Sequence, residues 1–455
     1  MRVIFFDLDC LRPEHLGCYG YERPTSPNID RVAQDGIRFE NYFCASSPCL
    51  PSRTALMSGR YGIHNGVISN VSAGARFRIR TSDYNGPLPQ NEVLPRHLRE
   101  HGTDTISISN FADRHSAWYW MCGWSEFHTP NLKCGAETAD EVLNVVMPWL
   151  RKNAKRDNYF LHINFWDIHR PYKMDDSWAE RFKDTPLPQS WPDADDIDRM
   201  KDYPGAFTAR NQWPWLDNKS PVALMPDEVT TRDQFEHMLN GYDASIAYTD
   251  HHVGAVLEEL KRQKIFDDTV IIISGDHGDA FGEHGIYSDH VCADECIHRI
   301  PLIIRWPELT GNGLSDERLL TNVDFAPTLC DLLNLPAVEQ WDGESFAASI
   351  RNKPGGSDRD YVVWDHGLYT VQRAVRTPRH LMIHTYHHQN YEQFDPVALY
   401  DMQNDRYQKS NIAETQPDVL AQCENYLNEW IAHQKSKPGF EGDPIDAILN
   451  ERHRA

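Results

Sequence analysis

The chain has 455 residues, a formal net charge of -22 and a sequence pI near 5.4. This length excludes a single small compact domain and predicts one large domain with a smaller partner. The negative charge disfavours non-specific binding to nucleic acid or to an anionic membrane surface, so an anionic substrate must be attracted by a local positive site.

The ten cysteines are spread along the chain without the close spacing of a small disulfide-linked scaffold, so we expect reduced thiols. The first residues lead directly into an apolar run, without the charged and then apolar leader that marks a signal peptide. No apolar run approaches the length of a membrane span. These features predict a cytoplasmic protein with neither a nucleic acid nor a membrane as its partner.

Short apolar runs alternate with helical stretches in the first 305 residues. The predicted strands cover residues 3–6, 159–165, 269–274 and 300–305, and the predicted helices cover residues 138–151 and 235–261. Strands that alternate with helices favour an α/β fold with helices on both faces of the sheet. Ligands gather beyond the carboxyl ends of the strands in such folds, and acidic clusters follow two of these strands, at Asp9 and at Asp276.

The remaining predicted elements are shorter. Residues 173–232 are rich in Trp, Pro and Asp and indicate a long loop that covers the substrate. A linker is predicted at 353–357, followed by strands at 361–364, 374–376 and 380–385 and a helix at 417–434. We therefore expect a catalytic domain at 1–355, a small α+β subdomain at 356–434 and a polar tail at 435–455. The tail would either wrap a neighbouring subunit of a homo-oligomer or stay mobile.

The most informative motif is Cys-Leu-Pro-Ser-Arg at residues 49–53, followed by Thr-Ala-Leu-Met-Ser-Gly-Arg at residues 54–60. It resembles the signature of the formylglycine-dependent sulfatases, which belong to the alkaline phosphatase superfamily. The resemblance implies that Cys49 is oxidised by a formylglycine-generating enzyme and then acts as the nucleophile. It also implies a large mixed β-sheet sandwiched by helices, with a smaller C-terminal antiparallel-sheet subdomain, which agrees with the predicted elements.

The modification suits the chemistry of a sulfate ester, whose sulfur is crowded and negatively charged. One hydroxyl of an aldehyde hydrate can attack the sulfur, and the other can later lose a proton so that the carbonyl re-forms and sulfate leaves. Arg53 lies one helical turn after residue 49, so we expect its guanidinium to hold the hydrate or a sulfate oxygen. The start of this helix would add backbone N–H groups and the positive end of the helix dipole.

Two acidic motifs resemble the metal-binding motifs of sulfatases. Asp9 opens Asp-Cys-Leu-Arg-Pro at residues 9–13, and Asp276 and His277 stand in Gly-Asp-His-Gly at residues 275–278. The resemblance implies that Asp9, Asp276, His277 and the modified Cys49 bind one divalent cation. Ca²⁺ is the usual ion of the family, and the donor set also suits Mg²⁺ or Mn²⁺.

The first motif departs from the family at its second position. Many sulfatases carry a second aspartate there, whereas this chain has Cys10. Asp7 points to the same side of the predicted strand as Asp9, because side chains alternate along a strand. Asp7 is therefore either a further metal ligand or a residue that orders the neighbouring loop.

Histidines are the natural candidates for the proton transfers, because imidazole titrates near neutral pH. His169, in His-Arg-Pro directly after a predicted strand, resembles the histidine that donates a proton to the leaving alcohol. His290 stands near the position where many sulfatases carry a lysine, so its charge would depend on pH. His115 is either a third catalytic histidine or a structural one. Asn70 either contacts the substrate or caps a helix.

The resemblance implies hydrolysis of a sulfate ester, on a small molecule or a saccharide, to an alcohol and inorganic sulfate. One alternative is a formylglycine-dependent hydrolase of phosphonate monoesters or phosphodiesters. Another is a catalytically silent module that binds sulfated ligands. The presence of both Cys49 and Arg53 favours an enzyme.

Overall fold

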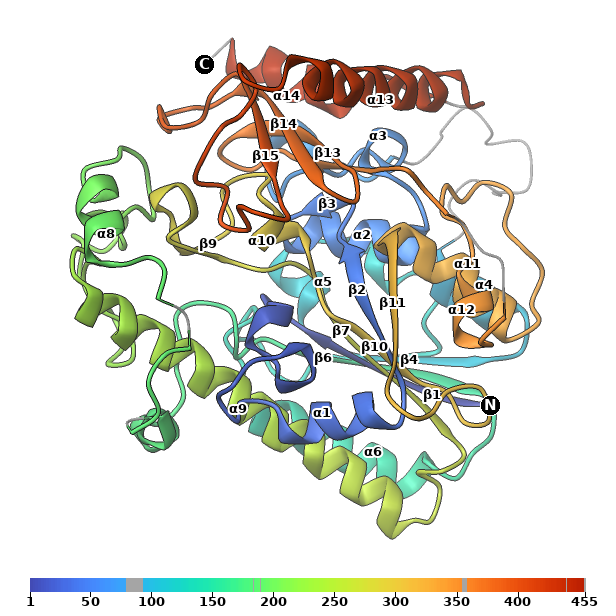
Figure 1. Cartoon of the computed structure of the whole chain (residues 1–455). Helices are drawn as coiled ribbons and strands as arrows, with labels where there is room; N and C mark the ends of the chain where they lie inside the picture. Colours follow the sequence, from blue (N-terminus) through green and yellow to red (C-terminus); the bar gives the residue numbers. More distant parts are fainter. Residues whose placement is uncertain (79–92, 183, 189, 354–357, 439, 454–455) are drawn as a thin grey trace.

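The computed structural model describes the chain except for residues 79–92, 183, 189, 354–357, 439 and 454–455. Over the described residues, the largest sheet has eight strands in the order β11-β2-β10-β7-β1-β6-β4-β5. Its strands are β1 (Arg2–Leu8), β2 (Ile37–Phe43), β4 (Asp104–Ile108), β5 (Glu126–His128), β6 (Tyr159–Phe165), β7 (Thr269–Gly275), β10 (Leu302–Arg305) and β11 (Leu314–Thr321). The expected α/β fold with a large mixed sheet is confirmed (Figure 1).

Strand β1 lies in the middle of the sheet and positions the first acidic motif. It pairs in parallel with β6 and β7, so that Leu8 lies opposite Phe165 and Gly275. The carboxyl ends of these three strands therefore meet at one edge of the sheet. By contrast, β10 is antiparallel to both of its neighbours. It follows that residues just after β1, β6 and β7 come together at one place.

Helices cover both faces of the large sheet (Figure 1). One hydrophobic core joins Ile4, Phe6 and Leu8 of β1 to the helices α1 (Pro27–Gln34), α6 (Ala139–Asn153) and α9 (Arg232–Arg262). The other joins Val3 and Phe5 to the helices α2 (Cys49–Ser58), α4 (Leu94–Glu100) and α11 (Phe325–Leu332). Because strand side chains alternate between the two faces, Asp7 belongs to the same face as Val3 and Phe5, the face covered by α2.

A smaller sheet has the order β15-β14-β13-β12-β3. Its strands are β3 (Ser46–Ser47), β12 (Val362–His366), β13 (Val371–Arg376), β14 (His380–His387) and β15 (Val397–Asp401). The antiparallel strands β12–β15 follow the predicted linker, of which residues 354–357 lie outside the described residues. Strand β3 ends two residues before Cys49 and pairs in parallel with β12, so the smaller sheet supports the segment that carries the predicted nucleophile.

The region from 173 to 232 has little regular structure, as its composition predicts. It contains only short helices over its described part, α7 (Asp176–Ala179), η5 (Glu180–Phe182) and α8 (Ala194–Met200). The other short elements are η1 (Pro13–His15), η2 (Gly17–Tyr19), α3 (Gly62–Asn65), η3 (Ser72–Gly74), α5 (Phe111–Arg114), η4 (Trp118–Met121), β8 (Ala280–Phe281), η6 (Glu283–Gly285), β9 (Tyr287–Asp289), α10 (Glu295–His298), η7 (Asn322–Asp324) and α12 (Ala347–Ile350).

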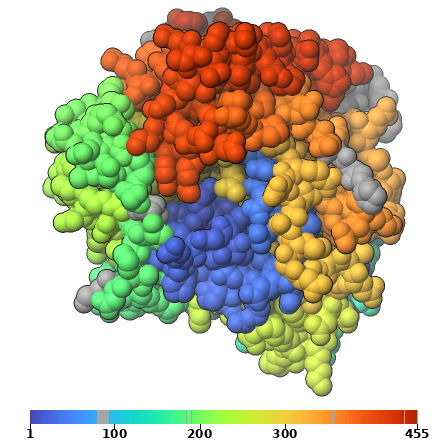
Figure 2. Space-filling view, viewed as in Figure 1, coloured from blue at the N-terminus to red at the C-terminus, as the bar shows by residue number. Residues whose placement is uncertain are grey.

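The C-terminal segment differs from the polar tail, wrapped on a neighbouring subunit or mobile, that its composition predicts. After α13 (Pro417–Ser436), residues 444–452 form a further helix, α14 (Pro444–Arg452). Its Ile445 and Ile448 are buried against Ile68 and Val371 of the same chain. Figure 2 shows the C-terminal residues gathered at one end of the molecule, above the N-terminal ones. A segment that already docks on its own chain gives no reason to expect that it wraps a neighbouring subunit.

Among the described residues, no helix combines the length and the apolar character needed to cross a lipid bilayer.

Candidate active site

Cys49 is the first residue of α2 and is only 1% exposed. Its Sγ lies 3.2 Å from Nε2 of His277. The next backbone N–H, of Leu50, donates to Oδ1 of Asn70 at 3.1 Å. Asn70 therefore satisfies a donor of the first helical turn, which agrees with its predicted capping role rather than with direct contact to a ligand.

Three carboxylates surround the guanidinium of Arg53, which is fully buried. Its Nε and Nη2 donate to the two carboxylate oxygens of Asp7 at 2.7 and 2.8 Å. Its Nη1 donates to Asp9 at 2.8 Å and to Asp276 at 2.5 Å. The guanidinium also lies between the rings of Phe111 and Trp166, with its carbon 5.3 and 5.0 Å from their centroids. Each nitrogen of Arg53 thus bonds a carboxylate, and its contact with the aldehyde hydrate or a sulfate oxygen stays a prediction.

The pKa shifts of these carboxylates indicate that Arg53 alone does not neutralise their negative charge. Burial opposes the ionisation of Asp9, but Arg53, His169 and His277 outweigh it, so the pKa of Asp9 is well below its usual value. Burial raises the pKa of Asp276, and repulsion from Asp9 and Asp7 adds to it against the attraction of Arg53. One guanidinium therefore does not balance three buried carboxylates, and a bound cation would stabilise all three in the ionised form.

The predicted metal ligands come together. Donor atoms of Asp9, Cys49, Asp276 and His277 all lie within 4.8 Å of one another, and all four residues are buried. In this group the Cys49 sulfur stands where an oxygen of the modified residue would lie. The two carboxylates, the imidazole and that oxygen are the kinds of ligand that Ca²⁺, Mg²⁺ or Mn²⁺ accepts, so the residues present fit a divalent cation.

Asp7 does not belong to this group of donors. Arg53 binds both of its oxygens, and His162 of β6 lies 3.0 Å from Oδ2. Burial opposes its ionisation, but Arg53 and His162 lower the pKa of Asp7 below its usual value. The geometry supports the alternative in which Asp7 orders its surroundings, here by orienting Arg53, rather than the one in which it binds the metal.

His169 and His290 lie next to each other, with ring centroids 5.9 Å apart, in opposite electrostatic environments. Burial and Arg114 lower the pKa of His169 to about 4. Burial also disfavours the charged form of His290, but Asp289 and Asp279 outweigh it and raise its pKa to about 9. At neutral pH the pair therefore consists of a neutral imidazole and a protonated one.

The structure adds residues that the motifs did not indicate. Arg114, at the end of α5, donates from Nη2 to Nε2 of His169 at 3.1 Å. Asp279 lies 2.8 Å from Nδ1 of His290. The only signals in the sequence were the position of Arg114 beside His115 and that of Asp279 within three residues of Asp276. His162 is in the middle of a buried strand, where no sequence signal marks it.

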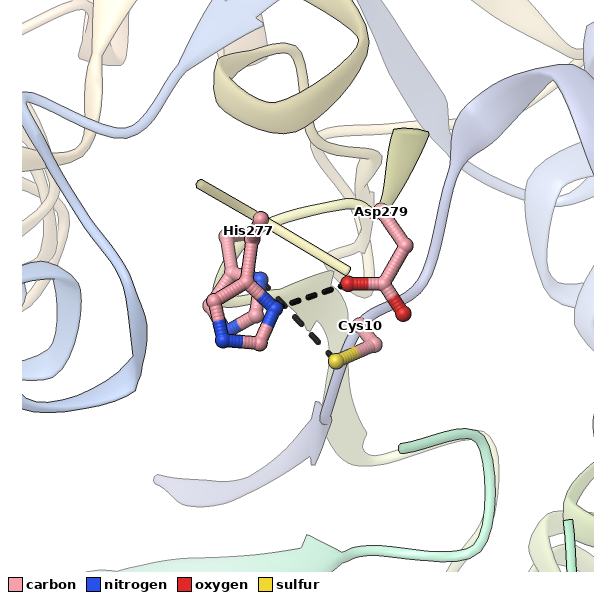
Figure 3. A group of neighbouring side chains, drawn as sticks. Cys10, His277 and Asp279 are labelled. Atoms are coloured by element: carbon pink, nitrogen blue, oxygen red, sulfur yellow. Dashed lines mark hydrogen bonds and ion pairs between the residues drawn. The ribbon is translucent and has the colours of Figure 1, made fainter. Parts of the chain in front are cut away.

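Cys10 also faces the site (Figure 3). Its Sγ donates to Oδ1 of Asp9 at 3.1 Å and lies 3.9 Å from Nδ1 of His277. The departure from the family pattern at residue 10 therefore concerns a side chain that faces the site rather than a distant loop.

His115 packs against Phe111, with ring centroids 5.1 Å apart. Its Nε2 is buried without a hydrogen-bond partner among the described residues. Burial, followed by Arg114 and Arg53, places its pKa well below the usual value. The imidazole is tilted against Phe111 and its Nε2 has no partner in the described part of the chain, so the catalytic and the structural alternatives for His115 both stay predictions.

Family comparisons agree with the motifs. The family model described as Sulfatase matches residues 2–335, and the one described as N-sulphoglucosamine sulphohydrolase, C-terminal, matches residues 282–436. The chain is 23% identical over 515 residues to an N-acetylglucosamine-6-O-sulfatase of Bacteroides thetaiotaomicron, covering 97% of this chain and 89% of that one. It is 24% identical over 465 residues to a Delta 4,5-hexuronate-2-O-sulfatase of the same bacterium, covering 98% and 91%.

Solved structures share the fold. One, of a protein in complex with its substrate D-glucosamine-2-N,6-O-disulfate, superposes with a TM-score of 0.78 at 20% identity, covering 97% of this chain and 99% of that one. The phosphonate monoester hydrolase of Agrobacterium radiobacter superposes with a TM-score of 0.71 at 20% identity, covering 95% of each chain.

Proposed function

The chain belongs to the sulfatase family and hydrolyses sulfate esters; from this premise we propose that formylglycine made from Cys49 is its nucleophile and that its substrate is a small sulfated saccharide. The observation that carries the proposal is the position of Cys49, at the N-terminus of α2 and within 4.8 Å of the donor atoms of Asp9, Asp276 and His277. Burial, with Asp9 and Asp276, raises the pKa of the Cys49 thiol well above its usual value. The unmodified thiol would therefore stay protonated and be a poor nucleophile.

In the proposed reaction, one hydroxyl of the aldehyde hydrate at residue 49 releases its proton to water, and its oxygen attacks the sulfur of the ester. The bond from sulfur to the alcohol oxygen breaks, and this oxygen takes a proton. The second hydroxyl then loses a proton, the carbonyl re-forms, and inorganic sulfate leaves with the oxygen that attacked. Water rehydrates the aldehyde for the next cycle.

One neutral and one protonated histidine suit a proton acceptor and a proton donor, respectively. We assign the protonated His290 to hold a sulfate oxygen and to donate a proton to the leaving alcohol. The neutral His169 can accept the proton of the second hydroxyl at Nε2 once Arg114, which donates to that nitrogen here, turns to the sulfate. This assignment departs from the role that the family resemblance implies for His169, because an imidazole with a pKa of about 4 is uncharged and a weak acid at neutral pH.

Arg114 supplies the local positive charge that a chain of net charge -22 needs for an anionic substrate, because the charge of Arg53 is already balanced by its carboxylates. Arg53 holds Asp7, Asp9 and Asp276 in place. Arg114, half-buried at the end of α5, is the more accessible of the two and can bind a sulfate oxygen. Asp9, Asp276, His277 and the modified Cys49 would hold a divalent cation, most consistent with Ca²⁺, which when bound polarises the sulfate and lowers the pKa of the attacking hydroxyl.

The saccharide part of the proposal rests on the relatives. Their names identify an N-acetylglucosamine-6-O-sulfatase and a hexuronate-2-O-sulfatase, and the chain covers almost the full length of both. All ten cysteines are free in the structure, which supports a reducing compartment such as the cytoplasm. A cytoplasmic enzyme would meet imported monosaccharides or short oligosaccharides, after maturation by a formylglycine-generating enzyme.

The proposal is tested with protein co-expressed with a formylglycine-generating enzyme. The substrates are glucosamine and unsaturated hexuronate carrying single O-sulfates, a long sulfated polysaccharide, and nitrophenyl esters of sulfate and of a phosphonate. We expect the highest kcat/KM on one of the sulfated monosaccharides. Faster cleavage of the phosphonate ester would move the protein to the phosphonate hydrolases, and activity confined to the polymer would contradict the small-substrate proposal.

The charge of His290 predicts the alkaline limb of the pH profile. Its pKa is raised from the usual 6.5 to about 9. Almost every His290 is therefore protonated at pH 6.5, and the protonated form is lost as the pH rises through about 9. We expect kcat/KM to fall over that upper range. Replacing Asp279 with asparagine removes one of the carboxylates that raise the pKa of His290, so the limb should move to lower pH. A limb that stays in place in Asp279→Asn would show that another group titrates there.

A further inference from the structure

A second group of metal-binding side chains lies beside the proposed catalytic ligands. Donor atoms of Cys10, His277, Asp279 and His290 all lie within 4.8 Å of one another, and all four residues are buried. Figure 3 shows three of them converging from two segments, Cys10 from the end of β1 and His277 and Asp279 from the loop after β7. Only His277 is shared with the group that contains Cys49.

His277 stands between the two groups and presents a different ring nitrogen to each. Its Nε2 is 3.2 Å from the sulfur of Cys49, and its Nδ1 is 3.9 Å from the sulfur of Cys10. The same Nδ1 lies 2.9 Å from the carbonyl oxygen of Gly278, a hydrogen bond that it would give up to bind a metal. The second group therefore lies beside the first and has its own donor atoms, although both groups include His277.

Asp279 provides an independent indication of a ligand. Its Oδ1 is 2.8 Å from Nδ1 of His290, whereas its Oδ2 is buried without a hydrogen-bond partner among the described residues. Asp279 is 0% exposed. A buried carboxylate oxygen without a partner is costly, and a cation bound between Asp279 and Cys10 would satisfy it.

The donor types indicate which cation. One thiolate, two imidazoles and one carboxylate form a set that Zn²⁺ accepts with tetrahedral geometry, whereas Ca²⁺ and Mg²⁺ prefer oxygen ligands. Tetrahedral zinc at its usual ligand distances places donors roughly 3.3 to 3.7 Å apart. The donors here are within 4.8 Å of one another, so a small contraction of side chains completes the site. The thiol of Cys10 loses its proton on binding, and His277 loses its ring N–H proton and bridges the two ions as an imidazolate when both sites are filled.

We propose that Cys10, His277, Asp279 and His290 form a second metal site, selective for Zn²⁺ and separate from the catalytic cation site. Zinc occupies one ring nitrogen of His290 and fixes the imidazole, so it draws His290 away from the sulfate that this residue is assigned to hold. Zinc at this site is therefore inhibitory. The inhibitory consequence rests on the proposed function, whereas the existence of the site does not.

The test uses Co²⁺ as a spectroscopic substitute for zinc, in a Cys49→Ala background so that Cys10 is the only thiol in the two donor groups. Equilibrium dialysis counts the bound ions, and absorption spectra report a thiolate-to-cobalt charge-transfer band. We expect two ions per chain, one of which brings the band. Cys10→Ser should remove the band and weaken that site by at least about 10-fold, and Asp279→Asn should weaken it similarly.

Cys44→Ser is the matched control, because Cys44 is also buried but belongs to neither donor group; it should keep both the band and the stoichiometry. Thermal unfolding of every variant shows which of them are folded, and Asp279→Asn provides the test if Cys10→Ser is not. A band that accompanies a single bound ion would assign Cys10 to the catalytic centre and overturn the second site. Two ions without a band, or a band that survives Cys10→Ser, would overturn it as well.

Discussion

Replacing Cys49 with alanine is expected to lower the turnover of a sulfate ester by about 10⁴-fold or more, which is the usual scale for the loss of a covalent nucleophile. The side chain lies at the start of α2, 3.2 Å from Nε2 of His277, and no other cysteine takes part in the donor group around Asp276. Alanine cannot be converted to formylglycine, so neither attack on sulfur nor release of sulfate can occur. The measurement is kcat/KM on the best sulfated monosaccharide, with mass spectrometry of the peptide that contains residue 49.

Two further variants make this result specific. Cys49→Ser retains a hydroxyl but lacks the second one, so we expect at most one turnover followed by accumulation of a sulfated serine, seen as a mass increase of that peptide. Cys44→Ser, a buried cysteine outside the donor group, should retain most of the activity. Cys49→Ala should still bind the sulfated monosaccharide that it can no longer hydrolyse. Turnover that persists in Cys49→Ala would place the nucleophile elsewhere.

The sequence could predict the parts of this site that depend on local geometry. Alternation along the first strand places Asp7 and Asp9 on one face, and they do lie on the same side of β1, both bonded to Arg53. The parallel pairing of β1 with β7 brings Asp276 to the same edge. Apolar runs and helical stretches in the sequence also predict the strands β1, β6 and β7 and the helices α6 and α9.

What could not be predicted depends on pairings between distant segments. The helical spacing between Cys49 and Arg53 could be predicted from the sequence. The partners of Arg53 could not, because they depend on how α2 lies across the ends of β1 and β7. In the structure these partners are three carboxylates. The docking of α14 depends on Ile68 and Val371, which are far from it in sequence. The opposite pKa shifts of His169 and His290 likewise depend on Arg114 and Asp279, which only the fold brings to them.

Replacing Arg53 with methionine is expected to lower the free energy of unfolding of the metal-free protein by about 3–5 kcal/mol, because it leaves buried carboxylates without their counter-ion. Asp7 and Asp9 have lowered pKa values that depend on Arg53. Such groups stabilise the fold above their ordinary pKa of 3.8, and this contribution is lost as the pH falls. The difference between the two proteins should therefore be largest at neutral pH and shrink below about pH 4.

A second buried arginine provides the matched control. Arg373 bonds Asp365 at 2.5 Å and Asp443 at 2.9 Å and is 1% exposed, but neither carboxylate belongs to a metal-binding group among the described residues. Arg373→Met should therefore destabilise the protein to a similar extent. Addition of Ca²⁺ or Mn²⁺ should restore much of the lost stability in Arg53→Met, since a cation can replace the guanidinium charge between Asp9 and Asp276, and should not do so in Arg373→Met. Equal responses to the cation would show that the carboxylates around Arg53 do not hold the metal.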